Sequence, residues 1–217
     1  MDKIYLDHNA TTPVAPEVLH IVTSVLQDQM GNPSSVHSMG RSARVLIDEA
    51  REQVASLIGA SPSEIVFTSG GTEANNLALL GVALGMGKSG GHIVTSQVEH
   101  PSVLNPCRQL ESMGFVVDRL RVDELGRIDL QSLENCLTES TLLISLQHAN
   151  SETGVLQDIV KIGEIARKKK VLFHTDAIQS VGKIPVRVQD LPVDMLSISA
   201  HKLNGPKGVG ALYLRKG

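Results

Sequence analysis

Short apolar runs rich in β-branched residues recur along the chain, and helical patterns or loops separate them. Alternation of this kind is typical of α/β proteins, whose mostly parallel sheets are buried on both faces. We therefore predict an α/β fold with a mostly parallel sheet covered by helices on both faces. The expected strands are Ile65–Thr68, His92–Ser96, Phe115–Leu120, Thr141–Gln147, Val171–Thr175, Met195–Ser199 and Gly210–Leu214.

Apolar residues spaced close to 3.6 apart indicate the helices, most clearly over Arg41–Ile58, which Gly59 ends. The run Lys168–Lys170 closes a further helix, where cations interact favourably with the helix dipole. The segment Gly85–Gly91 is the expected flexible loop. The other expected helices are Pro16–Gln29, Ala74–Ala83, Ser102–Met113 and Asp129–Leu137.

Composition argues against several classes of function. The 217 residues carry a net charge of −3 and 2% aromatic residues, which makes a stacking surface for nucleic acid improbable. No apolar run reaches the ~18 residues of a membrane span and no signal peptide is evident, so we expect a cytoplasmic protein. The two cysteines, Cys107 and Cys136, make neither a disulfide framework nor a metal site. Both are expected to be buried structural thiols on helices.

Lys202 directly follows an apolar strand and stands in the Gly/Pro-rich segment Ser197–Tyr213, flanked by Ser199 and His201. A lysine in a tight turn at a strand end is partly desolvated, which lowers the pKa of its amine. Such an amine can form an imine with a carbonyl compound. Taken alone, the residue is better explained as a solvated loop lysine.

Asp176 and Gln179 follow the strand Val171–Thr175. Pyridoxal phosphate needs a lysine for its aldehyde, a carboxylate against its ring nitrogen and an anion site for its phosphate. Asp176 is the candidate for the ring nitrogen, and Gln179 is the candidate for a hydrogen bond to the 3-oxygen. As an isolated residue, Asp176 is better explained as an N-cap of the next segment.

The turn Ser69–Glu73, with the sequence Ser-Gly-Gly-Thr-Glu, joins a strand to an apolar helix. Glycines let the backbone approach an anion closely, and the free N–H groups of a helix's first turn point at it. Gly71 and Thr72 are therefore candidates to hold a phosphate. A plain strand-to-helix connection is the alternative for this turn alone.

His100 lies just beyond the strand His92–Ser96 and offers a flat ring that could stack on a pyridine face. Its alternative is a helix-entry residue, with Pro101 in the first helical position. All of these candidates follow strand ends, and open α/β sheets bind ligands at the carboxyl ends of their strands. The sequence thus predicts one cofactor site at that edge.

Ordered motifs run along the whole chain: Tyr5–Pro13, Gly31–Ser35 with His37, Phe67–Glu73, Glu99-His100, His148–Gly154, His174–Gln179 and Ser197–Tyr213. They resemble the class V aminotransferase-like family, most closely the cysteine desulfurases of the nitrogen-fixation and iron–sulfur-cluster type. The resemblance implies that residues 1–217 form the pyridoxal-phosphate-binding large domain of a fold type I transferase. It also implies that the small C-terminal domain, the nucleophilic cysteine and an arginine for the substrate carboxylate lie beyond Gly217.

The resemblance gives each candidate a role toward the cofactor. Lys202 would bind it covalently and move protons, Asp176 would pair with the ring nitrogen, and Gln179 would pair with the 3-oxygen. His100 would stack on the ring and assist proton transfer. The residues implied to hold the phosphate are Gly71, Thr72, Ser199 and His201.

Other positions are implied to lie near the substrate. These are Asn32 and Asn150, while Ser151 replaces a family asparagine that contacts the cofactor or the bound substrate. Serine can donate the same hydrogen bond with a shorter reach, so we expect cofactor binding to survive this difference.

The implied activity removes sulfur from L-cysteine to give L-alanine and an enzyme persulfide, which a sulfur-acceptor or scaffold protein would receive. The implied assembly is a homodimer. The N-terminal motif and the loop Gly31–Ser35 have no evident partner in the sequence, so we expect them to be surface that meets another chain or the small domain.

Two alternatives remain open. A selenocysteine lyase, or another C–S lyase of the same family, would share every motif found here. A truncated relative without turnover would bind only the cofactor or a partner protein.

Overall fold

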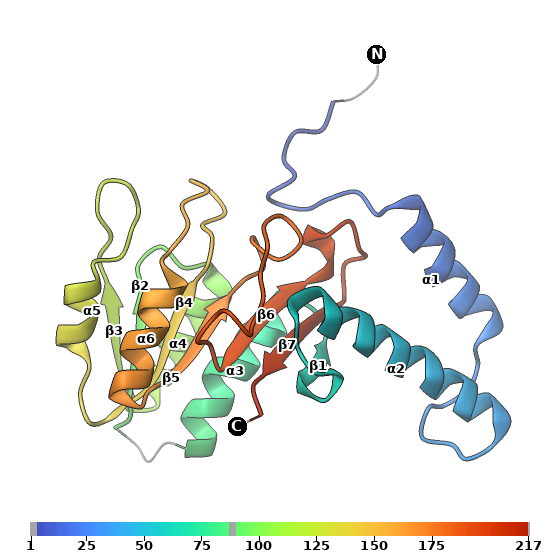
Figure 1. Cartoon of the computed structure of the whole chain (residues 1–217), viewed down its shortest axis with the longest axis horizontal. Helices are drawn as coiled ribbons and strands as arrows, with labels where there is room; N and C mark the ends of the chain where they lie inside the picture. The colour runs from blue at the N-terminus through green and yellow to red at the C-terminus, as the bar shows by residue number, and fades with distance from the viewer. Residues whose placement is uncertain (1–3, 87–89, 217) are drawn as a thin grey trace.

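The computed structural model describes residues 4–86 and 90–216. A seven-stranded sheet has the order β1-β7-β6-β5-β4-β2-β3 (Figure 1). β7 runs antiparallel to both of its neighbours, and the other pairs are parallel. β1 therefore points the same way as β6, and the predicted mostly parallel sheet is confirmed. The strands are β1 (Ile65–Thr68), β2 (His92–Ser96), β3 (Val116–Leu120), β4 (Thr141–Gln147), β5 (Leu172–Asp176), β6 (Met195–Ser199) and β7 (Gly210–Leu214).

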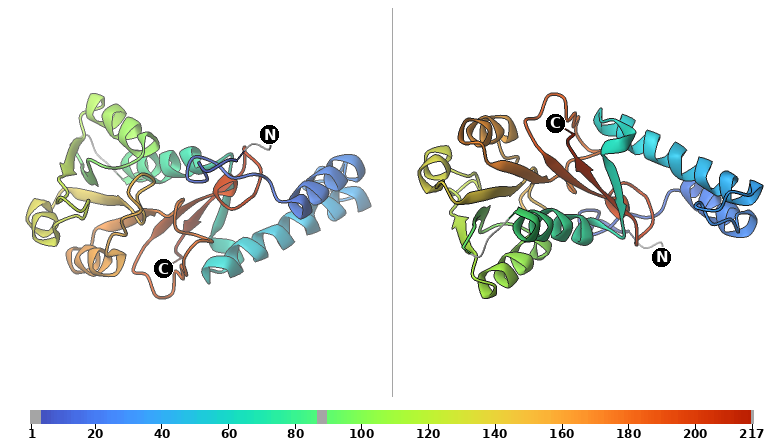
Figure 2. Two further views of the ribbon diagram at one scale, coloured as in Figure 1. Left: turned by 90° about the horizontal axis from the view of Figure 1, so that it is seen from above. Right: turned by 90° about the horizontal axis from the view of Figure 1, so that it is seen from below.

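Helices cover both faces of the sheet (Figures 1 and 2). One face packs against α3 and α4, and the other packs against α5, α6 and the end of α2. Short 3-10 turns occupy 62–64 and 200–202. The helices are α1 (Pro16–Asp28), α2 (Ser38–Ile58), α3 (Gly71–Met86), α4 (Pro101–Ser112), α5 (Leu130–Cys136) and α6 (Ile159–Lys169).

Consecutive strand residues supply opposite faces, because side chains alternate across a pleated sheet. In β2, Ile93 packs toward α3 and α4, whereas Val94 packs toward α5 and α6. In β4, Leu143 and Ile144 divide in the same way. The sheet is thus buried on both sides. Its interior also holds a buried polar group, because His174 of β5 bonds Ser145 of β4 and Ser197 of β6.

Element boundaries differ from the predicted ones at caps and turns. α2 begins at Ser38 rather than Arg41, because the His37 side chain accepts a hydrogen bond from Gly40 N and caps the helix. α3 begins at Gly71 and continues to Met86, into the predicted Gly85–Gly91 loop. The rest of that loop includes residues 87–89, which lie outside the described part of the chain.

The N-terminal helices extend away from the sheet (Figure 2). α1 buries none of its residues, and α2 reaches the core chiefly through Ala55 and Ile58 near its end. Among the described residues, no helix combines the length and the apolar composition needed to cross a membrane.

Candidate cofactor-binding site

A cavity of about 970 Å³ lies at the carboxyl edge of the sheet. Its walls come from the β1–α3 turn, the start of α4, the ends of β4, β5 and β6, and the N-terminal segment. The structure brings every residue predicted to bind the cofactor to this cavity: Gly71, Thr72, His100, Ser151, Asp176, Gln179, Ser199, His201 and Lys202.

The anion side of the cavity is the start of α3. A Cβ at Gly71 would lie 2.1 Å from Cδ1 of Ile178, so the Ile178 side chain would have to shift to admit one. Gly70 has a φ of +153°, which favours glycine. The Glu73 carboxylate accepts from Ser69 N and holds this turn, and these hydrogen bonds lower the pKa of Glu73. Gly71 and Thr72 line the cavity in the first turn of α3, where backbone N–H groups without helical partners are suited to bind an anion.

Asp176 ends β5 and is buried, with 7% of its surface exposed. Its Oδ2 accepts from Nδ2 of Asn75 at 2.7 Å, and its Oδ1 accepts from Ile178 N at 3.0 Å. Burial raises the pKa of Asp176, while these hydrogen bonds and the charge of Lys202 oppose the rise. The hydrogen bond from Ile178 N resembles the N-cap that was the alternative explanation for Asp176. Asp176 makes this bond and also lines the cavity.

His100 is the N-cap of α4, and its Nδ1 accepts from Ser102 N at 3.1 Å. An accepting Nδ1 places the ring proton on Nε2 in the neutral imidazole. The Ser102 hydroxyl lies 2.8 Å from Nδ1 and accepts from Nδ2 of Asn75 at 2.9 Å. Asn75 therefore connects His100, through Ser102, to Asp176. The imidazole of His100 is held by its Nδ1 acceptor, and its Nε2 is left as a donor.

Lys202 lies in the 3-10 turn after β6. Its Nζ donates to the backbone oxygen of Asn9 and, at 2.7 Å, to that of Ala10. Burial is the main cause that lowers the pKa of Lys202, and the charge of Lys183 lowers it further. The amine is thus partly desolvated, as the sequence predicted.

The N-terminal segment packs against the loop that carries Lys202. Thr12 N donates to the backbone oxygen of His201 at 2.9 Å, and Thr11 Oγ1 lies 3.1 Å from Nδ1 of His201. Nδ2 of Asn9 donates to the backbone oxygen of Ser151 at 3.1 Å. The expectation that the N-terminal motif has no partner within the chain is therefore wrong for its second half, because backbone and side-chain groups of this half bond to residues around the cavity.

The two asparagines assigned to the substrate do not line the cavity. Oδ1 of Asn150 accepts from Glu152 N and Thr153 N, both at 2.9 Å, and so shapes the turn that carries Ser151 to the cavity. Asn32 is exposed in the α1–α2 loop, where its Oδ1 accepts from Ser34 N at 2.9 Å. A substrate role for either asparagine stays a prediction.

Neither cysteine reaches the cavity. Cys107 is fully buried in α4, and burial raises the pKa of its thiol to about 12. Cys136, the last residue of α5, is half-buried, and its thiol donates to the backbone oxygen of Leu133 at 3.1 Å. The expected burial is confirmed for Cys107 and is incomplete for Cys136, because a helix end packs less closely than its middle.

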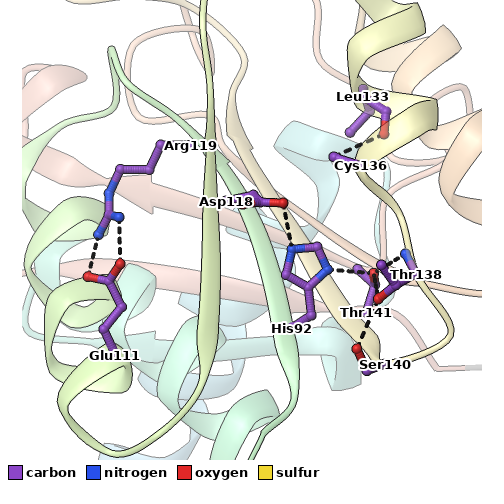
Figure 3. Close-up of polar contacts among 9 residues, drawn as sticks. All are labelled: His92, Glu111, Asp118, Arg119, Leu133, Cys136, Thr138, Ser140 and Thr141. Atoms are coloured by element: carbon purple, nitrogen blue, oxygen red, sulfur yellow. Dashed lines mark hydrogen bonds and ion pairs between the residues drawn. The ribbon is translucent and has the colours of Figure 1, made fainter.

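A second polar cluster occupies the opposite, amino edge of the sheet (Figure 3). Nδ1 of His92 lies 2.8 Å from Oγ1 of Thr141, and its Nε2 lies 3.2 Å from Oδ2 of Asp118. Thr141 Oγ1 also accepts from Thr138 N at 2.8 Å. Thr141 thus joins His92 to the local backbone, while Asp118 stands only at ion-pair distance from His92, and the cluster supports the start of the sheet.

Sequence reasoning missed residues that support the site from behind. Asn75 had a usable signal, since a polar pair, Asn75-Asn76, interrupts an otherwise apolar helix one turn after the phosphate-type turn. Lys183 gave a weak signal, because its contact with Gln179 depends on a turn that no periodicity indicates.

The sheet order, the lysine in the turn after β6 and the glycine-rich turn before α3 agree with the fold of the fold type I transferases. The chain belongs to the aminotransferase class-V family, whose pattern matches residues 4–217.

Individual relatives are similar over almost the whole chain. Cysteine desulfurase IscS of Dictyoglomus turgidum is 52% identical over 215 residues, which are 99% of this chain and 55% of that protein. Putative cysteine desulfurase IscS 1 of Bacillus subtilis is 47% identical over 216 residues, 100% of this chain and 57% of that protein. The chain spans about half the length of the curated relatives it matches.

Solved structures agree with this similarity. One described as SspA in complex with cysteine superposes with a TM-score of 0.96 at 45% identity, covering 99% of this chain and 62% of that chain. A NifS-like protein from Rickettsia africae gives a TM-score of 0.87 at 38% identity, covering 98% and 58%.

Proposed function

We propose that this chain binds pyridoxal 5'-phosphate and is the cofactor-binding part of a cysteine desulfurase. The observation that supports this most is the convergence of Lys202, Asp176 and the glycine-rich start of α3 on one cavity. An amine, a carboxylate and an anion cradle are the groups that this cofactor requires.

The residues present fit the cofactor. A Cβ at Gly71 would require the Ile178 side chain to move, and the first turn of α3 offers backbone N–H groups of the kind that bind a phosphate. His201 and Lys207 add positive or hydrogen-bonding groups to the same cavity. When bound, pyridoxal phosphate supplies an electron sink for a negative charge that develops on the amino-acid substrate.

The side chains of the cavity would orient the cofactor and move protons to and from it. Asp176 would hold a proton on the ring nitrogen, because a buried carboxylate favours a cationic partner over a neutral one. His100 would present its Nε2 proton toward the cavity, since Nδ1 accepts from Ser102 N. The amine of Lys202, with its lowered pKa, would bind the aldehyde and later accept or deliver a proton.

We propose L-cysteine as the substrate. The relatives named above are cysteine desulfurases, and one similar structure is described as a complex with cysteine. L-selenocysteine is the competing substrate, as it would be held by the same groups. The sulfur-accepting thiol is proposed to lie outside these 217 residues, because neither Cys107 nor Cys136 reaches the cavity and burial raises the pKa of both.

The experiment is a spectroscopic titration of the purified chain with pyridoxal phosphate, followed by L-cysteine, L-selenocysteine or D-cysteine. We expect a visible band on loading, and a change in that band with L-cysteine but not with D-cysteine. Alanine production from L-cysteine should stay at background and be insensitive to Cys107→Ser or Cys136→Ser. If no visible band forms, the cofactor proposal is wrong; if L-selenocysteine alone changes the band, the substrate proposal is wrong.

We propose that the whole protein is a homodimer and passes its sulfur to an acceptor protein. Exposed apolar side chains on α1 support a second copy as the partner of this helix, namely Leu19, Ile21 and Leu26. Sedimentation should show concentration-dependent self-association that weakens when Leu26 is replaced by Glu. A monomer at all concentrations would contradict this proposal.

A further inference from the structure

Lys183 is bonded to the side chain that is proposed to face the cofactor's 3-oxygen. Its Nζ donates to Oε1 of Gln179 at 2.6 Å. Nε2 of the same Gln179 donates to the backbone oxygen of Asn9 at 2.9 Å, and Lys202 Nζ donates to that oxygen too. The two lysines are therefore joined through one amide and one backbone oxygen.

The backbone holds Lys183 in this place. Gly182 has a φ of +76°, and a Cβ there would lie 2.4 Å from Cδ2 of Leu203. Leu203 directly follows Lys202, so the turn that carries Lys183 packs against the loop that carries the reactive amine. Lys183 N donates to the backbone oxygen of Ser180 at 3.0 Å, which closes the turn.

The amide of Gln179 can face either way, because its oxygen and its NH₂ group have almost the same shape. An ammonium has three donors and no acceptor, so the group beside Lys183 Nζ must be the oxygen. The NH₂ group must then face the other side, toward Asn9 and the cavity that Gln179 lines. Its two hydrogens can serve the Asn9 oxygen and a cofactor oxygen together.

We propose that Lys183 is a positioning residue that fixes the amide orientation of Gln179, so that Nε2 is presented as a donor to the 3-oxygen of pyridoxal phosphate. This inference rests on the proposed function and adds a residue to its site. A donor at the 3-oxygen stabilises the deprotonated form of the lysine-bound cofactor. An amide free to turn would present its oxygen and remove that stabilisation.

Other charged groups near Lys202 also influence the pKa of its amine. Asp176, Asp7 and Glu152 raise the pKa of Lys202, whereas burial and Lys183 lower it. Loss of the Lys183 charge would by itself raise the pKa of Lys202, free or bound to the cofactor. The contribution through Gln179 must therefore be separated from the contribution through space.

The experiment compares Lys183→Met, which removes the donor and the charge, with Lys183→Arg, which keeps both. The readout is the pH midpoint of the visible absorption of the chain loaded with pyridoxal phosphate. We expect the midpoint to rise by about one pH unit in Lys183→Met and to stay near the original in Lys183→Arg. Each substitution is then repeated with Gln179→Leu, where Lys183→Met should shift the midpoint by less than half as much.

A second readout uses the chain before loading: the pH dependence of Lys202 modification by an amine-specific reagent, located by peptide mass spectrometry. Its midpoint should rise in Lys183→Met, which also shows that the variant is folded around Lys202. A midpoint of the loaded chain that is the same in Lys183→Met as in the original overturns the inference. An equal shift in the Gln179→Leu background overturns it too, because Lys183 would then act through its charge alone. If the original chain shows no visible band after loading, the proposal that it binds pyridoxal phosphate is itself wrong.

Discussion

Similar side chains have different roles at the two edges of the sheet. At the amino edge, His92 is satisfied by Thr141 on one side and faces Asp118 on the other (Figure 3). At the carboxyl edge, His100 and Asp176 are also held by hydrogen bonds, yet each keeps a place on a cavity. The comparison teaches that residue type does not mark the site. The site is distinguished instead by polar side chains that are held by hydrogen bonds from the protein and also line a cavity.

Burial of charge also separates the two edges. The side chain of Asp118 is 54% exposed, so water screens its interaction with His92. Asp176 and Glu99 at the carboxyl edge are both buried, and burial raises the pKa of Glu99 to about 8. The charge of Asp176 raises the pKa of Glu99 further, so burial and this neighbour both favour the protonated form of Glu99.

The largest expected effect comes from removing charge at the carboxyl edge alone. Asp176→Asn keeps one acceptor oxygen, for either Asn75 or Ile178, and removes the charged partner of a cationic ring nitrogen. Breaking a buried charge pair costs about 3–5 kcal/mol, so pyridoxal phosphate should bind at least about a hundredfold more weakly. Asp118→Asn is the matched control and should leave the affinity unchanged, as measured by equilibrium dialysis. Equal losses in both variants would break the comparison.

A smaller effect concerns pH and Glu99. Its pKa rises from 4.5 to about 8 on folding, so the folded state holds the proton more tightly than the unfolded state. This contribution to stability is therefore fully present below pH 4.5 and is lost progressively as the pH rises to about 8. Glu99→Gln should abolish that decline. Urea unfolding at a series of pH values measures it, and an unchanged slope in Glu99→Gln would show that Glu99 is ionised.

At the amino edge, Thr141→Val should affect stability without affecting cofactor binding. The isosteric change leaves His92 Nδ1 and Thr138 N without their partner, which costs about 1–2 kcal/mol. Chemical unfolding should show this loss, while the affinity for pyridoxal phosphate stays constant. A loss of affinity with unchanged stability would show that the amino edge belongs to the site.

The smallest effect is expected for the ion pair of Arg119 with Glu111, which lies on the surface near the same edge (Figure 3). Exposed pairs contribute about 0–1 kcal/mol, so Glu111→Gln should lower the free energy of unfolding by less than about 1 kcal/mol. Added salt should reduce the difference further. A loss larger than that of Thr141→Val would contradict this order.

Much of the fold followed from the sequence, because alternation of apolar residues determines which faces are buried. The strands were predicted to within a residue or so, and the cofactor candidates gathered at one edge because parallel strands end together. Boundaries that depend on a cap, such as His37 before α2, were displaced. The side chain of Asn150 shapes a turn beside the cavity, and its assignment to the substrate stays a prediction. Contacts such as Lys183 with Gln179 depend on turn geometry that no periodicity encodes.

The central claim is that the amine of Lys202 is the group that binds the cofactor's aldehyde. The direct measurement loads the chain with pyridoxal phosphate, reduces it with borohydride and locates the modified lysine by peptide mass spectrometry. Lys183 and Lys207 serve as internal controls, because one is bonded to Gln179 and the other lines the cavity. We predict the label on Lys202 and its absence from Lys202→Ala. A label on Lys183 or Lys207 in the original chain would contradict the account.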